Sequence, residues 1–63
     1  MKNKRIKVVM TQVGINQSEL ADILNVPNSE VTVMLNKYEL AVKEQNNITA
    51  KIREWDALRK RGA

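Results

Sequence analysis

The sequence predicts an all-α fold, a small bundle of four to five helices with two short helices joined by a tight turn at its centre. Apolar residues recur at helical spacing along most of the 63 residues. Residues that end or start helices, Gly14, Asn25 and Pro27, separate these apolar stretches. A chain of this length forms one domain with a core that is only just sufficient. Residues 1–63 are therefore expected to be a single domain.

The first predicted helix covers about residues 3–13. Its apolar positions follow the i, i+3, i+4, i+7 spacing of one helix face and are Ile6, Val9, Met10 and Val13. Gly14 ends this helix, because glycine readily takes the left-handed conformation found at helix C-termini.

The second predicted helix starts at Gln17. Asn16, followed three residues later by Glu19, forms a capping-box pattern. The helix ends at Asn25, because asparagine tolerates the left-handed conformation of a helix stop. Its inner face carries Leu20, Ala21 and Leu24. The small Ala21 permits two helices to cross steeply after a short turn.

The third predicted helix covers about residues 28–35. Pro27 has a φ suited to a helix entry but supplies no side-chain cap, which leaves Asn28 or water to satisfy the free amides. Val31, Met34 and Leu35 share the inner face. The opposite side presents Asn28, Ser29, Thr32 and Val33, with Asn36 one turn later.

The last third of the chain contains a helix exit, an unassigned stretch and a final helix. Residues 36–39 form the exit, and residues 40–47 are expected to be a loop with one helical turn. The final helix starts at about Asn47 and frays over residues 59–62. Its apolar face consists of Ile48, Ile52, Trp55 and Leu58. This face either fills the small core or forms a homodimer seam through Ile52, Trp55 and Leu58.

Residues 17–36 resemble the helix-turn-helix of the Cro and phage-repressor class, the XRE-type family. The resemblance covers about a third of the chain strictly and about two thirds loosely. The matching positions are Gln17, Ala21, Leu24, Val26, Val31 and Met34. Asn25 stands where the family favours glycine, and Pro27 where serine or threonine commonly caps. The resemblance implies a repressor-like fold that binds double-stranded DNA and commonly pairs.

The outer side of helix 28–35 has the chemistry of a base-reading surface in the major groove. Asn28 can bond adenine through two hydrogen bonds, Ser29 and Thr32 can donate or accept, and Val33 can meet a thymine methyl. Glu30 would repel phosphates unless it lies at the rim or accepts from a cytosine amino group. The alternative is that these residues form a solvated helix face.

The resemblance also implies phosphate contacts on both sides of this helix. Gln17 would contact a phosphate or brace a side chain of the recognition helix, and Asn16 and Ser18 could donate as well. Asn36, Lys37 and Tyr38 resemble the family's Asn-Gly-Lys segment, which clamps the DNA backbone. The glycine of that segment is missing here, and Tyr38 could equally pack on the domain.

Charge is unevenly distributed around a net charge of +4. Residues 1–13 carry no acid and four bases, which are Lys2, Lys4, Arg5 and Lys7. Residues 14–36 carry three acids and no base, and residues 37–63 carry seven bases and four acids. Phosphate attraction must therefore come from residues that flank the motif. The first basic group either reaches phosphates or forms a solvated helix turn.

Several classes of function are excluded by composition. The chain has no cysteine and no histidine, so disulfides, zinc fingers and the usual metal sites are excluded. No glycine-rich phosphate loop or paired carboxylates are present, so no enzyme, cofactor or small-molecule ligand is expected. No apolar run approaches the roughly 20 residues that span a bilayer, and no secretory signal is recognisable. A cytoplasmic location is expected.

Three functions fit these observations. The first is a sequence-specific transcriptional repressor of the Cro-like sort from a phage or mobile element. The second is a DNA-binding module of a larger machine, because residues 34–38 and 52–55 also resemble the N-terminal domain of Mu-type transposition ATPases. The third is a helical protein-interaction module, such as an antitoxin, which the acidic motif would allow.

Overall fold

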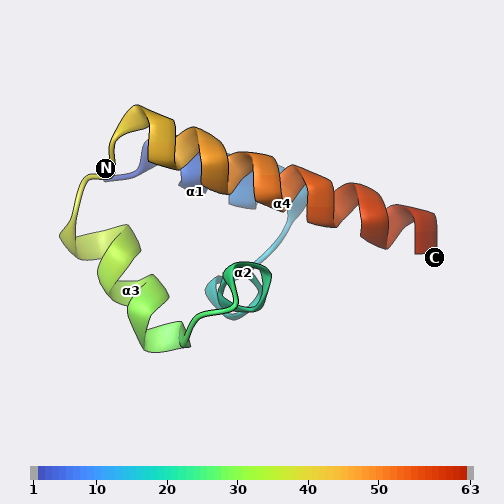
Figure 1. Ribbon diagram of the computed structural model, residues 1–63, viewed down its shortest axis with the longest axis horizontal. Coiled ribbons are helices and arrows are strands. Elements are labelled where there is room, and N and C mark those ends of the chain that lie inside the picture. Colours follow the sequence, from blue (N-terminus) through green and yellow to red (C-terminus); the bar gives the residue numbers. More distant parts are fainter. Residues whose placement is uncertain (1, 63) are drawn as a thin grey trace.

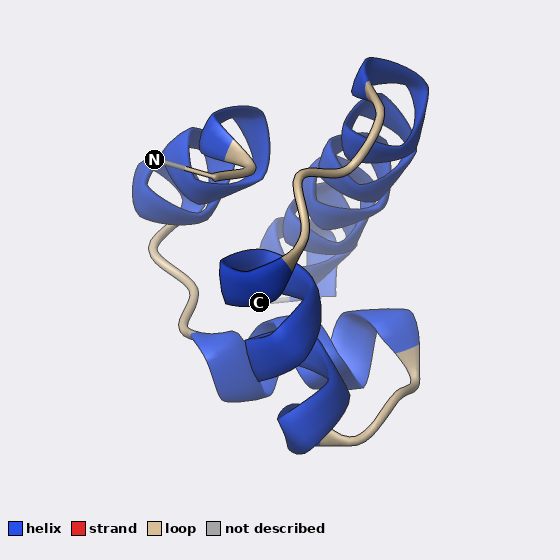
Figure 2. Ribbon diagram, turned by 90° about the vertical axis from the view of Figure 1, so that its left-hand side faces the viewer, coloured by secondary structure: helices blue, strands red, loops and turns tan. Residues whose placement is uncertain are grey.

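The computed structural model describes residues 2–62 and shows four helices and no strand in this range. They are α1 (Lys4–Val13), α2 (Gln17–Leu24), α3 (Asn28–Lys37) and α4 (Val42–Gly62). α1 packs along α4, and α2 contacts both α3 and α4 (Figure 1). Figure 2 shows the same helices from the end at which α3 leads into α4. The prediction of a small all-α bundle is confirmed, with four helices.

The predicted helix ends are confirmed in the first half of the chain. Asn16 and Glu19 form the complete capping box at the start of α2. Gly14 and Asn25 end α1 and α2 in the left-handed conformation, with φ of 82° and 57°. Pro27, with φ −62°, precedes the first residue of α3 and provides no side-chain hydrogen bond.

The turn between α2 and α3 makes the two helices cross steeply. Figure 1 views α2 nearly end-on, whereas α3 lies across the picture. The backbone N–H of Val26 donates to the carbonyl of Ala21 at 3.0 Å, which closes the end of α2. Ala21 is buried, as expected of a small residue at the point where two helices cross.

The core takes one fully buried side chain from each helix. These residues are Ile6, Leu20, Val31 and Ile52, and they are surrounded by the buried Val9, Ile15, Ala21 and Leu35. Burying an aliphatic side chain of this size contributes about 1.5–3 kcal/mol. All four helices are thus held by a single core, as expected of a single domain.

Two helix boundaries differ from the prediction. α3 continues to Lys37, two residues past the expected end. α4 starts at Val42, so most of the stretch 40–47 is helix instead of a loop. Gln45 explains the early start, because its buried side-chain amide donates to the carbonyl of Leu40 at 2.8 Å and to Glu39 at 2.7 Å. Asparagine is a weak helix former that is common at helix starts, and the sequence therefore predicted that the helix begins at Asn47.

The end of α4 is helical through Gly62, where fraying was expected. Asp56 binds two basic side chains of the next turn, at 2.7 Å from Arg59 and 3.1 Å from Lys60. The hydrogen bond from Lys60, followed by that from Arg59, holds the pKa of Asp56 below its ordinary value. Such pairs at i, i+3 and i, i+4 stabilise a helix, and bases in the last turn complement its dipole.

The apolar face of α4 is divided between the core and the surface. Ile52 is fully buried within this one chain, so of the two alternatives for this face the structure shows the core at Ile52. Trp55 is half-buried against the core, and the guanidinium of Arg59 lies 4.6 Å from its ring centre. Leu58 is 59% exposed. Only Trp55 and Leu58 of the predicted seam thus reach the surface.

Within the described residues, no helix has the combined length and apolar character needed to cross a membrane. The longest helix, α4, carries charged residues in its first turn and again from Lys51 to Arg61.

Candidate nucleic-acid interface

The predicted base-contacting residues lie together on the exposed side of α3. Val31 and Leu35 are buried beneath the helix, whereas Asn28, Ser29, Thr32 and Val33 are exposed. Asn36 is exposed one turn later. The inward and outward sides of α3 therefore agree with the prediction from spacing.

A hydrogen-bond network joins the start of α2 to the start of α3. Nε2 of Gln17 donates to Oδ1 of Asn28 at 2.9 Å and also contacts the hydroxyl of Thr32. Nδ2 of Asn28 in turn donates to Oγ of Ser18 at 3.1 Å. Of the two roles that the resemblance implies for Gln17, the structure shows the bracing of a side chain on the following helix.

This network determines which hydrogen-bond donors and acceptors of Asn28 and Thr32 remain free for a partner. Asn28 uses one amide hydrogen and one lone pair, which leaves one of each. Thr32 donates its hydroxyl to the carbonyl of Asn28 at 3.2 Å. Its hydroxyl proton is therefore used within the helix in the free protein, and its role as donor or acceptor to a base stays a prediction. Asn28 is turned towards Ser18, so its predicted role in capping the amides of α3 is not seen.

Asn16 serves chiefly as the cap of α2. Its side-chain oxygen accepts from the backbone N–H of Glu19 at 2.8 Å, and its own N–H donates to the Glu19 carboxylate at 3.2 Å. Both Asn16 and Ser18 are exposed beside the start of α2. Ser18 contacts Asn28 on α3, and the side-chain oxygens of Asn16 and Ser18 already accept hydrogen bonds from this chain.

The other outward flank of α3 is apolar. Here a hollow of about 510 Å³ is lined by Leu24, Val26, Ser29, Glu30, Val33, Met34 and Tyr38. Val33, 45% exposed, forms part of its wall. Glu30 also lies at this hollow and so faces away from the network of Gln17 and Asn28. The polar and apolar flanks of α3 meet at Ser29 and Val33.

The C-terminal end of α3 carries Lys37 and Tyr38, which are both exposed. Asn36 donates its side-chain amide to the carbonyl of Thr32 at 3.0 Å, so it lies back along its own helix. Tyr38 follows in an extended conformation. The three residues of the predicted phosphate clamp are thus exposed at one end of α3.

Asn3 holds this end of α3, a role that the sequence analysis missed. Its buried side-chain nitrogen donates to the carbonyls of Met34, Leu35 and Tyr38 at 3.0, 3.0 and 2.8 Å. Its side-chain oxygen accepts from the N–H of Leu40 at 2.8 Å. An asparagine before a helix reads as a local cap in sequence, and no periodic signal indicates partners more than thirty positions away.

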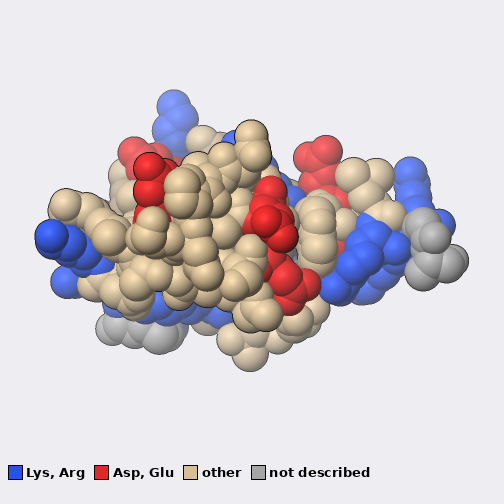
Figure 3. Space-filling view, turned by 90° about the horizontal axis from the view of Figure 1, so that it is seen from below, with Lys and Arg blue, Asp and Glu red and all other residues tan. Residues whose placement is uncertain are grey.

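The surface over α2 and α3 is mostly uncharged. Figure 3 shows this face, with acidic side chains within it and basic side chains towards its two ends. The acids on these helices are Glu19, Asp22 and Glu30. In the described part of the chain no cluster of three or more carboxylates, histidines or cysteines is placed to hold a metal ion. Hydrogen bonding and shape therefore dominate what this face offers to a partner.

Comparison with known proteins assigns no family to this chain. No protein-family model matches it, and no curated protein or solved structure matches it either. We therefore base the proposed function on the geometry of α2, α3 and the residues that hold them.

Proposed function

We propose that this protein binds double-stranded DNA with sequence specificity, with α3 in the major groove, and acts as a repressor of the Cro-like sort. The observation that carries the proposal is the network of Gln17, Ser18, Asn28 and Thr32. It fixes an amide side chain on the exposed N-terminal part of a surface helix. Amides in this position read base edges in helix-turn-helix proteins.

The dimensions of α3 suit the major groove. The groove is about 12 Å wide and admits one α-helix. The outward residues Asn28, Ser29 and Thr32 are short, which permits close approach of the helix to the bases. Asn28 keeps the one donor and one acceptor that pairing with adenine requires, and Val33 offers a methyl-bearing surface to thymine.

Phosphate contacts would come from both ends of the helix pair. Asn16, Gln17 and Ser18 lie at the start of α2, and Lys37 and Tyr38 lie at the end of α3. The acids on α2 and α3 oppose strong nonspecific attraction to phosphates. Binding to unrelated DNA should therefore be weak, and most of the affinity should depend on the base sequence.

A homodimer on DNA completes the proposal. One recognition helix reads only a few base pairs, and two-fold pairing doubles the readout at half-sites about 34–36 Å apart. Leu58, which is exposed, and Trp55, which is half-buried, provide an apolar surface on α4 for a second copy. Such a repressor would act in the cytoplasm, where it meets the DNA.

The apolar hollow beside α3 favours a second candidate function, binding of a protein segment. Val33 and Tyr38 line it, and Glu30 adds one negative charge. A helical interaction module would use this flank and leave the network of Gln17 and Asn28 without a task. DNA binding accounts for both flanks of α3, and we therefore prefer it.

Selection of bound sequences from a random duplex pool at about physiological salt tests the proposal. We expect an enriched inverted repeat with half-sites near one helical turn apart. Asn28→Ala should abolish the enrichment at one position of each half-site, whereas Asn47→Ala, an exposed asparagine on α4, should leave it unchanged. Binding without any enriched sequence contradicts base readout. No binding at all would favour a protein partner.

A further inference from the structure

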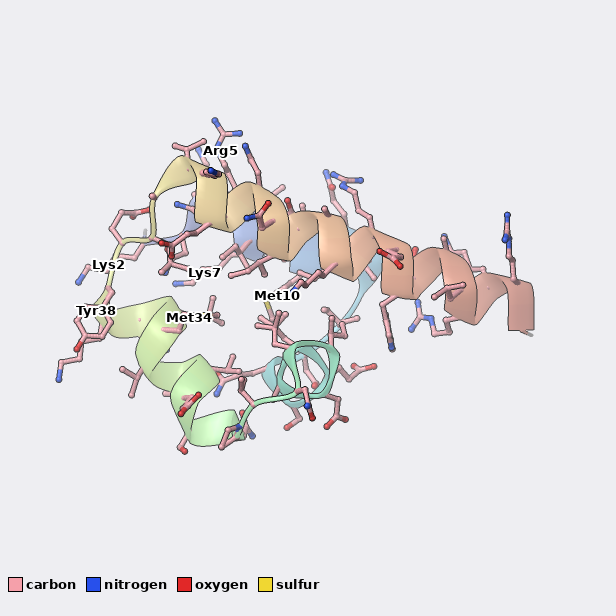
Figure 4. All side chains as sticks on the ribbon, in the orientation of Figure 1. Lys2, Arg5, Lys7, Met10, Met34 and Tyr38 are labelled. Carbon is pink, nitrogen blue, oxygen red and sulfur yellow. The ribbon has the colours of Figure 1, made fainter. Side chains whose placement is uncertain are left out.

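A basic corner lies at the C-terminal end of α3, where the N-terminal segment of the chain meets the end of this helix. We define the basic corner as Lys2, Lys37 and Tyr38. Nζ of Lys2 lies 3.4 Å from the carbonyl oxygen of Lys37, although the two residues are 35 positions apart in the sequence. Figure 4 labels Lys2 and Tyr38, which lie close together at this end of α3. All three side chains are exposed.

We propose that the basic corner binds one phosphate of the DNA backbone, with Lys2 as a direct contact and Asn3 as the residue that positions it. The inference rests on the proposed DNA binding and adds two residues to it. The sequence alone left two roles open for Lys2, a phosphate contact or part of a solvated helix turn. The proposal selects the phosphate contact.

A helix C-terminus is an unfavourable place for a phosphate unless its carbonyls are occupied. The last four carbonyls of a helix lack partners within the helix and carry a partial negative charge. Here the side-chain nitrogen of Asn3 occupies the carbonyls of Met34 and Leu35, and Lys2 approaches that of Lys37. This end of α3 therefore presents ammonium groups outward with its own negative dipole offset.

Asn3 fixes the path of the chain as it leaves α3. It donates to the carbonyl of Tyr38 and accepts from the N–H of Leu40, so it holds both sides of Glu39. Its amide orientation is set, because exchange of oxygen and nitrogen would place an oxygen against three carbonyls. Asn3 itself is left-handed, with φ 56°, a conformation that asparagine tolerates well. That bend directs Lys2 towards Lys37.

Among the described residues, Glu39 is the one acid bonded to the N-terminal segment that carries Lys2 and Asn3. Its carboxylate accepts from the backbone N–H of Asn3 at 3.1 Å and from the side chain of Gln45 at 2.7 Å. These two donors tie it to the N-terminal segment and to α4. Two lysines against one carboxylate leave the region with a net positive charge.

The neighbouring base Lys4 provides a matched control. Lys4 and Arg5 line a different hollow, between α1 and α4, together with Asn46 and Arg53. Figure 4 shows Arg5 on the side of the molecule away from α3. Lys4→Gln removes the same charge as Lys2→Gln only two positions away, but from outside the basic corner.

The experiment measures affinity for the selected duplex as a function of salt for the whole chain and its Lys2→Gln, Lys37→Gln and Lys4→Gln variants. Each phosphate contact contributes about 0.9 to the slope of log K against log salt. We expect Lys2→Gln and Lys37→Gln each to flatten the slope by about one and to weaken binding roughly tenfold at 0.1 M salt. Lys4→Gln should change the slope far less.

Thermal unfolding of the same variants separates phosphate binding from a merely structural role. Lys2→Gln should unfold like the unsubstituted protein, because one long, exposed hydrogen bond contributes little. If Lys2→Gln has the slope of Lys4→Gln while Lys37→Gln flattens it, the phosphate role of Lys2 is overturned. If the unsubstituted protein binds no duplex specifically, the proposed function fails instead, and the two failures are distinguishable.

Discussion

The side-chain nitrogen of Gln17 lies 2.9 Å from the side-chain oxygen of Asn28, which joins the first residue of α2 to the first residue of α3. Asn28 also donates to Ser18 at 3.1 Å, so its amide is held from two directions. A side chain that is fixed before binding loses less conformational entropy when it meets its partner. Under the proposed function, Gln17 would thus hold Asn28 ready to contact a base.

Asn28→Ala should weaken binding to the selected duplex by about 1–3 kcal/mol, because one base-reading amide is lost. Binding to an unrelated duplex should stay nearly unchanged. Titration of both duplexes at one salt concentration measures the two effects. Asn47→Ala is the control, since Asn47 is exposed on α4. An equal loss on both duplexes would show that Asn28 does not read bases.

Gln17→Ala should weaken specific binding through Asn28. In a double-mutant cycle on the selected duplex, the losses from Gln17→Ala and Asn28→Ala should fall short of additivity by at least about 0.5 kcal/mol, as is typical of residues in one network. A parallel cycle of Lys37→Ala with Asn28→Ala should be additive. Additive losses in the first cycle would exclude a bracing role for Gln17.

The architecture was predictable where local signals agree with the fold. The capping box at Asn16 and the left-handed positions Gly14 and Asn25 mark helix ends through their own backbone preferences. The early start of α4 was not predictable, because it depends on the tertiary burial of Gln45. Asn46 and Asn47 locally favour a loop or a helix start at this point instead of a helix interior.

The candidate site was predictable as a set of exposed residues and less so as a network. Helical spacing places Asn28, Thr32 and Val33 outward. It does not show that Thr32 turns its hydroxyl proton towards its own helix or that Val33 joins an apolar hollow. Asn3 could not be found at all, since its partners lie in a distant part of the sequence.

Asn3→Gly should lower the free energy of unfolding by about 1–3 kcal/mol, because buried carbonyls at the end of α3 lose their donor. Glycine keeps the left-handed backbone accessible, so this variant isolates the amide. Asn3→Ala should be at least as destabilising, since alanine disfavours the left-handed conformation. Urea unfolding measures both. A stability unchanged by Asn3→Gly would contradict the role of the amide in holding α3.

Leu58→Glu should convert a dimer into a monomer with little effect on folding. Leu58 is 59% exposed, and exposed substitutions usually change stability by less than about 0.5 kcal/mol. Sedimentation equilibrium, with and without duplex, measures the association. Val42→Glu is the control at another exposed apolar position. Dimerisation that survives Leu58→Glu would place the seam elsewhere.

The end of α4 should depend on pH through Asp56. Hydrogen bonds from Lys60 and Arg59 lower the pKa of Asp56 in the folded state. Its contribution is therefore present above the ordinary value of 3.8 and is lost as the pH falls through the lower folded value. A carboxyl-carbon NMR titration should give a midpoint below 3.8, and Asp56→Asn should remove the pH-dependent loss of helix. A midpoint at or above 3.8 would show that the two bases do not stabilise the carboxylate.

In the proposed complex, the polar side of α3 meets the DNA bases. The most direct test follows backbone amide chemical shifts of the nitrogen-15-labelled protein as the selected duplex is added at about physiological salt. We predict the largest changes at Gln17 and over residues 28–38, with smaller changes on the far side of α4. Changes confined to α4 or to residues 24–26, with Asn28 and Thr32 unaffected, would contradict recognition by α3.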